Sequence, residues 1–206
     1  MNTADKSAVS IVDKYFSLLP ERQCGECMVC CEYMPISAKG LIKPAQTLCP
    51  HVIVNRGCSI YETRPKVCRT WHCLWRRDAS MPNEMRPDKS RMIFSLIVHE
   101  DERSLFEQAH ITCIAMASKS DYAIPMVSET IQRYIDEGAL PVWLSYGGGK
   151  QLVYPDPELA DAIDRPVSTR FTEKVAEGKQ WRARYENLQE NLLRKNGLLE
   201  CQFVKR

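Results

Sequence analysis

Four cysteines occupy eight consecutive positions in the segment "CGECMVCC", residues 24–31. Prolines interrupt the next fifty residues, and large apolar side chains are scattered there without a period. Such a segment cannot bury enough apolar surface by itself to offset the entropy of ordering it. Its thiols must therefore supply the missing stabilisation. Eight of the chain's ten cysteines lie in this stretch: Cys24, Cys27, Cys30, Cys31, Cys49, Cys58, Cys68 and Cys73.

Metal binding is favoured over disulfide formation because we expect the protein to be cytoplasmic. The first twenty residues lack the apolar core of a signal peptide, and no stretch approaches the roughly 20 apolar residues of a membrane helix. Disulfides are rare in the cytoplasm, where clustered thiols more often bind metal or carry out redox chemistry. The net charge of only +2 argues against a nucleic-acid partner or an anionic membrane.

The cysteine spacing is compatible with two kinds of metal. Cys24, Cys27 and Cys30 form C-x2-C-x2-C, the run that begins the bacterial ferredoxin motif, and Cys49-Pro50 is similar to the Cys-Pro that closes it. This pattern favours an iron–sulfur cluster of the 4Fe-4S type. Zinc sites also use C-x2-C, usually as two separated pairs. Zn²⁺ is therefore the alternative metal.

The adjacent pair Cys30 and Cys31 bears on the number of centres. Neighbouring side chains on an extended backbone point in opposite directions, so we expect these two thiols to serve different centres, unless one of them is a spare. Eight thiolates suit two four-coordinate centres, one cluster with a mononuclear ion, or one cluster with reserve thiols. His72, beside Cys73, can replace one sulfur.

Arginines accompany the later cysteines. Arg64 and Arg69 lie between them, and Arg76 and Arg77 follow directly. Nearby cations lower thiol pKa values and favour metallation at neutral pH. For Arg76 and Arg77, a solvated surface is an equally good interpretation.

The segment resembles the YkgJ-type cysteine-cluster family, described as zinc- or iron-chelating or iron–sulfur proteins with a CxxCxxCC domain. The resemblance covers residues 24–73 and rests on "CGECMVCC", the isolated "LCP" and "GCSIYETRPKVCRTWHC". It implies metal chelation by all eight cysteines. The wider family includes flagellin lysine methylases, but the resemblance carries no reaction to this chain, so enzymatic activity is left open. The residues that match the second part of the family pattern are Cys58, Tyr61, Arg64, Pro65, Cys68, Arg69, Trp71 and Cys73.

The remaining sequence predicts an α+β fold. We expect an N-terminal helix and cysteine-rich module over residues 1–80, with residues 81–206 packed on it as one compact unit. Periodicity and turn residues predict the individual elements. They are a helix over 4–19 ended by Pro20, a hairpin of strands 91–98 and 105–116, a helix over 126–137 stopped by Gly138, a second hairpin around "GGGK", a short helix at "DPELADAI", and a long helix over 170–195 ending at "KNG".

Several other residues that could bind a metal or a phosphate are better explained by their role in the fold. Cys113 lies in an apolar run and Cys201 beyond the long helix, so neither is expected to bind metal. His99 and His110 have no ligand partner nearby in the sequence. "GGGK" lacks the spacing of a phosphate-binding loop. The apolar stripe of the C-terminal helix is expected to pack on its own domain, with a homodimer seam as the alternative. This stripe consists of Trp181, Tyr185, Leu188 and Leu192.

These observations predict a metal-binding protein that carries an iron–sulfur cluster. The sequence does not define its role; the roles we expect are electron transfer with a protein partner or service as a redox cofactor site in a modifying enzyme. The alternative is a zinc-stabilised interaction module without catalytic activity. A zinc-ribbon-like nucleic-acid binder is disfavoured because the chain has no basic stripe.

Overall fold

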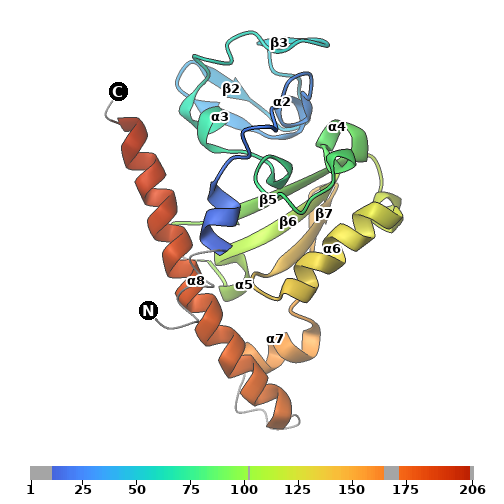
Figure 1. Cartoon of the computed structure of the whole chain (residues 1–206), viewed down its shortest axis with the longest axis vertical. Helices are drawn as coiled ribbons and strands as arrows, with labels where there is room; N and C mark the ends of the chain where they lie inside the picture. The colour runs from blue at the N-terminus through green and yellow to red at the C-terminus, as the bar shows by residue number, and fades with distance from the viewer. Residues whose placement is uncertain (1–10, 102, 165–171, 205–206) are drawn as a thin grey trace.

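The computed structural model describes residues 11–101, 103–164 and 172–204, apart from the side chains of 172–173 and 197–204. Figure 1 shows two parts: the cysteine-rich region at the top, and below it a sheet with helices. We call residues 20–80 the cysteine module and residues 81–196 the sheet body. The predicted α+β fold is confirmed.

The cysteine module is built from short elements joined by turns, as its sequence predicts. No element in it exceeds five residues, because cysteine, proline and glycine interrupt every periodic pattern. The predicted helical turn within "RPKVCRTWHC" is present as α3. The elements are α2 (Val29–Tyr33), β1 (Ile36–Ala38), β2 (Leu41–Lys43), β3 (Val52–Ile53), β4 (Gly57–Cys58), α3 (Lys66–Thr70) and the 3-10 helix η1 (Leu74–Arg76).

The sheet body contains a mixed four-stranded sheet in the order β5-β6-β7-β8. Both predicted hairpins are confirmed: β5 pairs antiparallel with β6, and β7 with β8. A parallel pairing of β6 with β7 joins the hairpins into one sheet, which the sequence did not predict. The strands are β5 (Met92–Val98), β6 (Ala109–Ala115), β7 (Val142–Tyr146) and β8 (Gly149–Tyr154).

The parallel pairing requires a crossover, which η3 (Lys119–Ala123) and α6 (Pro125–Glu137) provide. The helix α6 begins with proline at its first position and ends at Gly138, whose φ of 62° is the left-handed conformation typical of a helix C-terminus. The helix predicted over 126–137 and its stop are therefore confirmed. Short elements link the module to the sheet, namely η2 (Asn83–Met85) and α4 (Pro87–Ser90).

Two predicted boundaries are wrong. Residues expected to begin a strand form α5 (Leu105–Gln108) instead. The overlooked signal is the pattern "SLFE", typical of a helix start: the Ser104 hydroxyl donates to a Glu107 carboxylate oxygen at 2.7 Å. The long helix α8 (Thr172–Val204) continues past "KNG", because an isolated glycine costs only about 1 kcal/mol in a helix and no proline follows it.

Two further predicted helices can be compared with the described residues. The helix predicted over 4–19 is seen over 11–16, and its earlier residues lie outside the described part. The predicted short helix at "DPELADAI" is confirmed as α7 (Pro157–Asp164). Within the described residues, no helix is both long enough and apolar enough to cross a membrane.

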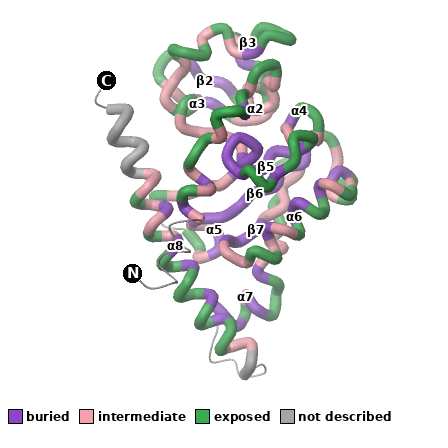
Figure 2. The backbone as a smooth tube through the Cα atoms, in the orientation of Figure 1, coloured by how far each residue is buried: buried purple, intermediate pink, exposed green. Residues whose placement is uncertain are grey.

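One large core holds the sheet body together, and Figure 2 shows the buried backbone concentrated in β5 and β6. The predicted stripe of α8 is buried in this core, with exposed fractions of 4% or less. The Trp181 ring stacks on Tyr185 with centroids 4.8 Å apart. The prediction that this stripe packs on its own domain is confirmed, and a homodimer through α8 stays a prediction. Leu74 and Trp75 of η1 also join this core, so the end of the cysteine module is anchored in the sheet body.

Candidate metal centre

The first cysteine run combines a tight turn with a short helix. The amide of Cys27 donates to the carbonyl of Cys24 at 2.9 Å, which closes the C-x-x-C turn. Gly25 lies inside this turn with a φ of 53°. Helix α2 then carries Cys30 and Cys31 in its first turn. Four thiols thus emerge from a span of eight residues.

Three later segments of the chain bring the other four cysteines close to this run. The amide of Cys49 donates to the carbonyl of Cys31 at 3.0 Å. Cys58 lies on β4, opposite Val52 of β3. Cys68 lies on α3 and Cys73 is the residue before η1.

A backbone contact brings the first run and β4 together. Gly57 has a φ of 91°, and a Cβ atom at this position would overlap the carbonyl oxygen of Gly25. Only glycine permits this approach without strain. The residue before Cys58 is therefore in contact with the residue after Cys24.

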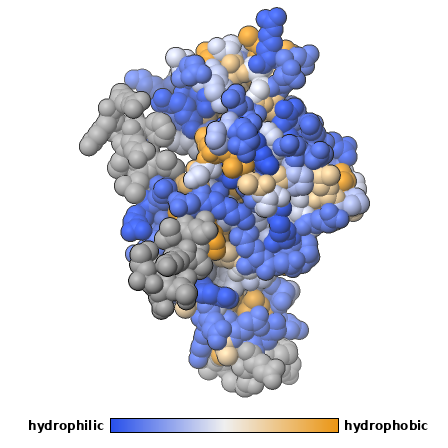
Figure 3. All heavy atoms as spheres, in the orientation of Figure 1, coloured by the Kyte–Doolittle hydropathy of each residue, from blue (hydrophilic) through white to orange (hydrophobic). Residues whose placement is uncertain are grey.

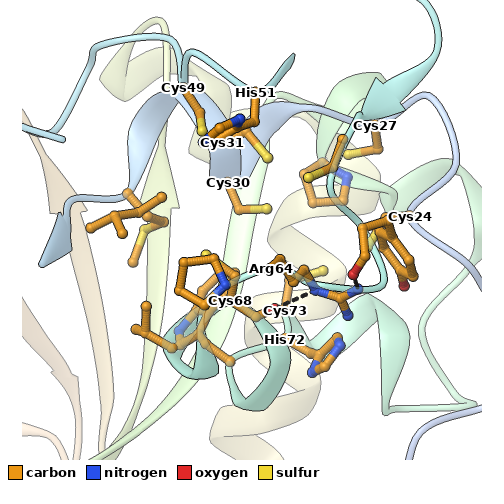
Figure 4. A pocket seen from close by; sticks show the side chains of 18 of the residues that line it. Cys24, Cys27, Cys30, Cys31, Cys49, His51, Arg64, Cys68, His72 and Cys73 are labelled. Atoms are coloured by element: carbon orange, nitrogen blue, oxygen red, sulfur yellow. Dashed lines mark hydrogen bonds between the residues drawn. The ribbon is translucent and has the colours of Figure 1, made fainter. Parts of the chain in front are cut away.

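All eight predicted cysteines line one cavity of about 160 Å³. Figure 4 shows Cys31 and Cys49 close together on one side, and Cys24 and Cys27 on another. None of the nine cysteines with described side chains forms a disulfide. Cys113 is fully buried in the core of the sheet body, as its apolar surroundings in the sequence predict, and it is absent from the cavity lining. That it binds no metal stays a prediction. Cys201 lies outside the residues whose side chains are described.

One group of thiols lies against a small apolar cluster. Cys31, Cys49 and Cys68 pack together there with Ile36 and Leu41. Cys58 is their neighbour. Burial raises the pKa of Cys58, and the negative charges of Cys31 and Cys49 raise it further. The pKa of Cys68 is raised by burial and then by the same two thiols and Cys58.

The other group lies toward the sheet body. Cys73 packs against the large core, and burial raises the pKa of its thiol to about 12, with further contributions from the charges of Cys24 and Cys27. The pKa of Cys30 is raised by its hydrogen bond to Cys31, by burial, and by the charges of Cys31, Cys24 and Cys73. These four thiols, at positions 24, 27, 30 and 73, are therefore neighbours.

Cys30 and Cys31 form the junction between the groups. Their hydrogen bond lowers the pKa of Cys31 to about 7, helped by the charges of Lys43 and Arg64. The expectation that the two side chains point in opposite directions is wrong, because they lie on a helix and not on an extended strand. Successive helical residues are separated by only about 100° around the axis.

Cations surround the thiols. An Arg76 nitrogen donates to the sulfur of Cys24 at 3.6 Å, and Arg64 donates to the carbonyl of Cys68 at 3.0 Å. Arg76 and Arg77 are buried, with exposed fractions of 7% and 9%, so the solvated-surface interpretation is wrong for both. Arg69 is exposed.

The cavity lining contains cations but no carboxylate. Outside the lining, the Asp88 carboxylate interacts with Cys27. Within the lining, ionised thiols are the groups that can balance Arg64 and Arg76. Thiolates are ligands for zinc and for iron–sulfur clusters, whereas magnesium and calcium prefer oxygen. The donor set therefore fits the predicted metals, although no three Cys, His, Asp or Glu side chains in the described part of the chain already surround a common point as ligands.

Two histidines also line the cavity. His72, predicted as a possible substitute ligand, has its pKa lowered to about 4 by burial and by the charges of Arg77 and Arg76. Sequence reasoning missed His51, which Figure 4 places beside Cys31 and Cys49. The available signal was its position two residues after Cys49. His110 lies on β6 and His99 directly follows β5. Their ring centroids are 6.1 Å apart, and neither residue is part of the lining.

The chain matches no family model, no curated protein and no solved structure. Its likeness to the cysteine-cluster family therefore rests on the motif residues alone.

Proposed function

We propose that the protein binds metal through the eight cysteines of its module, with an iron–sulfur cluster as the preferred cofactor. One observation carries this proposal: thiols from the first run, from the "LCP" segment, from β4 and from α3 with η1 converge on a single cavity. None of the described thiols is consumed in a disulfide. A convergence of this kind serves a shared ligand better than it serves packing, since sulfhydryl groups form only weak hydrogen bonds.

The electrostatics of the cavity support the same proposal. Four thiolates around a divalent ion, or around a 4Fe-4S core of the same charge, leave a doubly negative centre. Arg64 and Arg76, both in contact with the thiol segments, are placed to offset that charge. When bound, an iron–sulfur cluster would supply one-electron chemistry. The cysteines would hold it, and the surrounding arginines would stabilise its charge. We propose electron exchange with a protein partner, or service as the redox site of a modifying enzyme.

A zinc-stabilised module is the second candidate function. The small apolar cluster contains only three buried residues, Ile36, Leu41 and Cys49, so metal is needed to order the segment whatever its further role. Exposed large apolar side chains surround this cluster, and Figure 3 shows hydrophobic side chains at the surface of this region. They would suit an interaction role. They include Ile42, Leu48, Ile53, Val54 and Val67.

Anaerobic purification followed by an absorption spectrum and elemental analysis tests the proposal. A brown preparation with iron and acid-labile sulfide in equal amounts is the expected result. A colourless protein with stoichiometric zinc, still free of iron after reconstitution with iron and sulfide, would favour the zinc module. If the native protein binds no metal and all eight thiols react freely with a thiol reagent, both candidates are wrong. The matched control is Cys113→Ala, which should leave the metal content unchanged because Cys113 is outside the cavity.

A further inference from the structure

We infer that the cysteine module holds two separate metal centres, each bound by four cysteines. This inference rests on the proposed metal-binding function and adds the number of centres and their ligands. The inner centre comprises Cys24, Cys27, Cys30 and Cys73. The outer centre comprises Cys31, Cys49, Cys58 and Cys68.

Two segments supply the inner group, and a hydrogen bond from Arg76 to the sulfur of Cys24 connects them. Cys24 and Cys27 share one turn, and Cys30 follows three residues later in α2. The fourth thiol, Cys73, comes directly before η1, and Arg76 at the end of η1 donates to the sulfur of Cys24 at 3.6 Å. The segment of Cys73 and η1 is therefore hydrogen-bonded to the turn that contains Cys24.

The outer group is assembled around the small apolar cluster. Cys31, Cys49 and Cys68 lie in that cluster together with Val52. Because Cys58 is paired with Val52 across β3 and β4, the strand pairing brings the fourth thiol to the same place. The Cys49 amide is bonded to the Cys31 carbonyl at 3.0 Å, which ties the "LCP" segment to α2.

Each group has its own cations. The charge of Cys73 acts on Arg77, and Arg76 is bonded to Cys24. The charges of Lys43 and Arg64 act on Cys31. Two doubly negative centres would thus each face two positive side chains. No carboxylate lines the cavity, and beside it Asp88 interacts with Cys27 of the inner group.

The peptide bond between Cys30 and Cys31 joins the two centres. Consecutive residues of a helix project about 100° apart, so one helix can supply one ligand to each of two neighbouring sites. The centres are therefore expected to be close neighbours.

Cadmium is a suitable probe because it binds thiolates and ¹¹³Cd is directly visible by NMR. The full-length protein is reduced, stripped of metal and titrated with ¹¹³Cd²⁺ under anaerobic conditions. Two equivalents and two resonances in the four-sulfur region are expected. Two matched variants come from one segment: Cys73→Ser should remove or shift the inner resonance alone, and Cys68→Ser the outer resonance alone.

Cys73 packs on the large core, so Cys73→Ser can also disturb folding. A second pair of variants therefore serves as a control. Cys27→Ser and Cys58→Ser change half-buried thiols, one from each group, and should reproduce the two patterns. The inference is overturned if the protein binds one equivalent, or if any single variant abolishes both resonances, which would indicate one shared centre. Failure to bind ¹¹³Cd²⁺ at all would instead overturn the proposed metal-binding function.

Discussion

The sheet body and the cysteine module differ first in what they bury. The large core contains 24 buried residues, 20 of which belong to the sheet body. The cluster inside the module contains three, one of which is Cys49. At about 25 cal/mol for each Å² of apolar surface removed from water, the sheet body has an ample driving force for folding. The module buries too little apolar surface to have such a driving force.

The module compensates with buried cations that bind backbone carbonyls. Lys43, only 3% exposed, donates to the carbonyls of Glu32, Pro44 and Thr47 at 2.7–3.0 Å. Arg77 donates to the carbonyl of Thr70 at 2.9 Å and to that of Tyr15. These polar contacts hold loops in the module, and the proposed metal–thiolate bonds would add to them, whereas side-chain packing holds the strands below. The two regions should therefore respond differently to perturbation.

Metal removal should give the largest difference. A structural zinc site contributes roughly 10–16 kcal/mol, far more than the small apolar cluster can replace. We expect a chelator to abolish amide protection over residues 20–80 while the strands of the sheet body keep theirs. Hydrogen exchange with and without metal measures this. Equal protection of residues 20–80 in both states would show that the module folds without metal.

Replacing Arg22 should give the next largest effect. Its guanidinium donates to the carbonyls of Trp75 and Met81 at 2.6 Å and of Asp78 at 3.0 Å, which ties the beginning of the module to its end. Arg22→Met leaves these carbonyls without that donor, and we expect a loss of about 3–5 kcal/mol in the free energy of unfolding.

The matched control for Arg22 is Arg182→Met. Arg182 is an exposed residue paired with Glu186 within α8, so its loss should cost about 0.3–0.5 kcal/mol. Urea unfolding of the metal-loaded protein compares the two variants. A similar small cost for both would mean that the Arg22 clamp does not stabilise the module.

Thiol reactivity should report whether the metal-free module keeps the structure described above. In that structure the pKa of Cys31 is lowered to about 7 and the pKa of Cys58 is raised, so alkylation of Cys31 would be about tenfold faster at pH 7, after allowance for the weaker nucleophilicity of a less basic thiolate. Because we expect metal removal to disorder residues 20–80, the two thiols of the metal-free protein should instead react at similar rates. Mass spectrometry after brief iodoacetamide treatment measures this, and a tenfold preference for Cys31 would show that the module stays ordered without metal.

Gly57→Ala should reduce the free energy of unfolding by less than Arg22→Met does. The new methyl group would overlap the Gly25 carbonyl oxygen at a φ of 91°, with an expected cost of about 1–3 kcal/mol and reduced metal content. Gly147→Ala is the control, because Gly147 also has a positive φ but no atom within 4 Å of the added carbon. Its cost should be only about 1 kcal/mol, with unchanged metal content. Equal losses of metal in both variants would show that the Gly25–Gly57 contact is unimportant.

The elements that the sequence predicted best are those whose signals are local. Residues 92–98 are apolar except for Ser95 and become β5. Gly138 ends α6 because glycine adopts the left-handed conformation without strain. The parallel pairing of β6 with β7 was not predictable in this way. Register depends on contacts between residues about thirty positions apart, and one sequence contains no direct record of them.

The same distinction applies to the candidate site. Cysteine chemistry and spacing indicated all eight lining thiols from sequence alone. The expectation that Cys30 and Cys31 serve different centres stays a prediction, and its original reason, an extended backbone, is wrong because both residues lie on a helix. His51 and the burial of Arg77 could not be foreseen, because both depend on how distant loops pack against each other.

The position of β5 at the end of the sheet has a consequence for self-association. An edge strand presents unpaired backbone groups that can pair with another copy of the chain. The first four residues of β5, Met92 to Ser95, are nevertheless buried on both faces, Ile93 lines the cysteine cavity, and Figure 1 shows the module above this strand. A disordered module would leave this end of the sheet uncovered. If the proposed metal binding holds, metal depletion should then raise light scattering more steeply than in proportion to protein concentration while the sheet body is still folded.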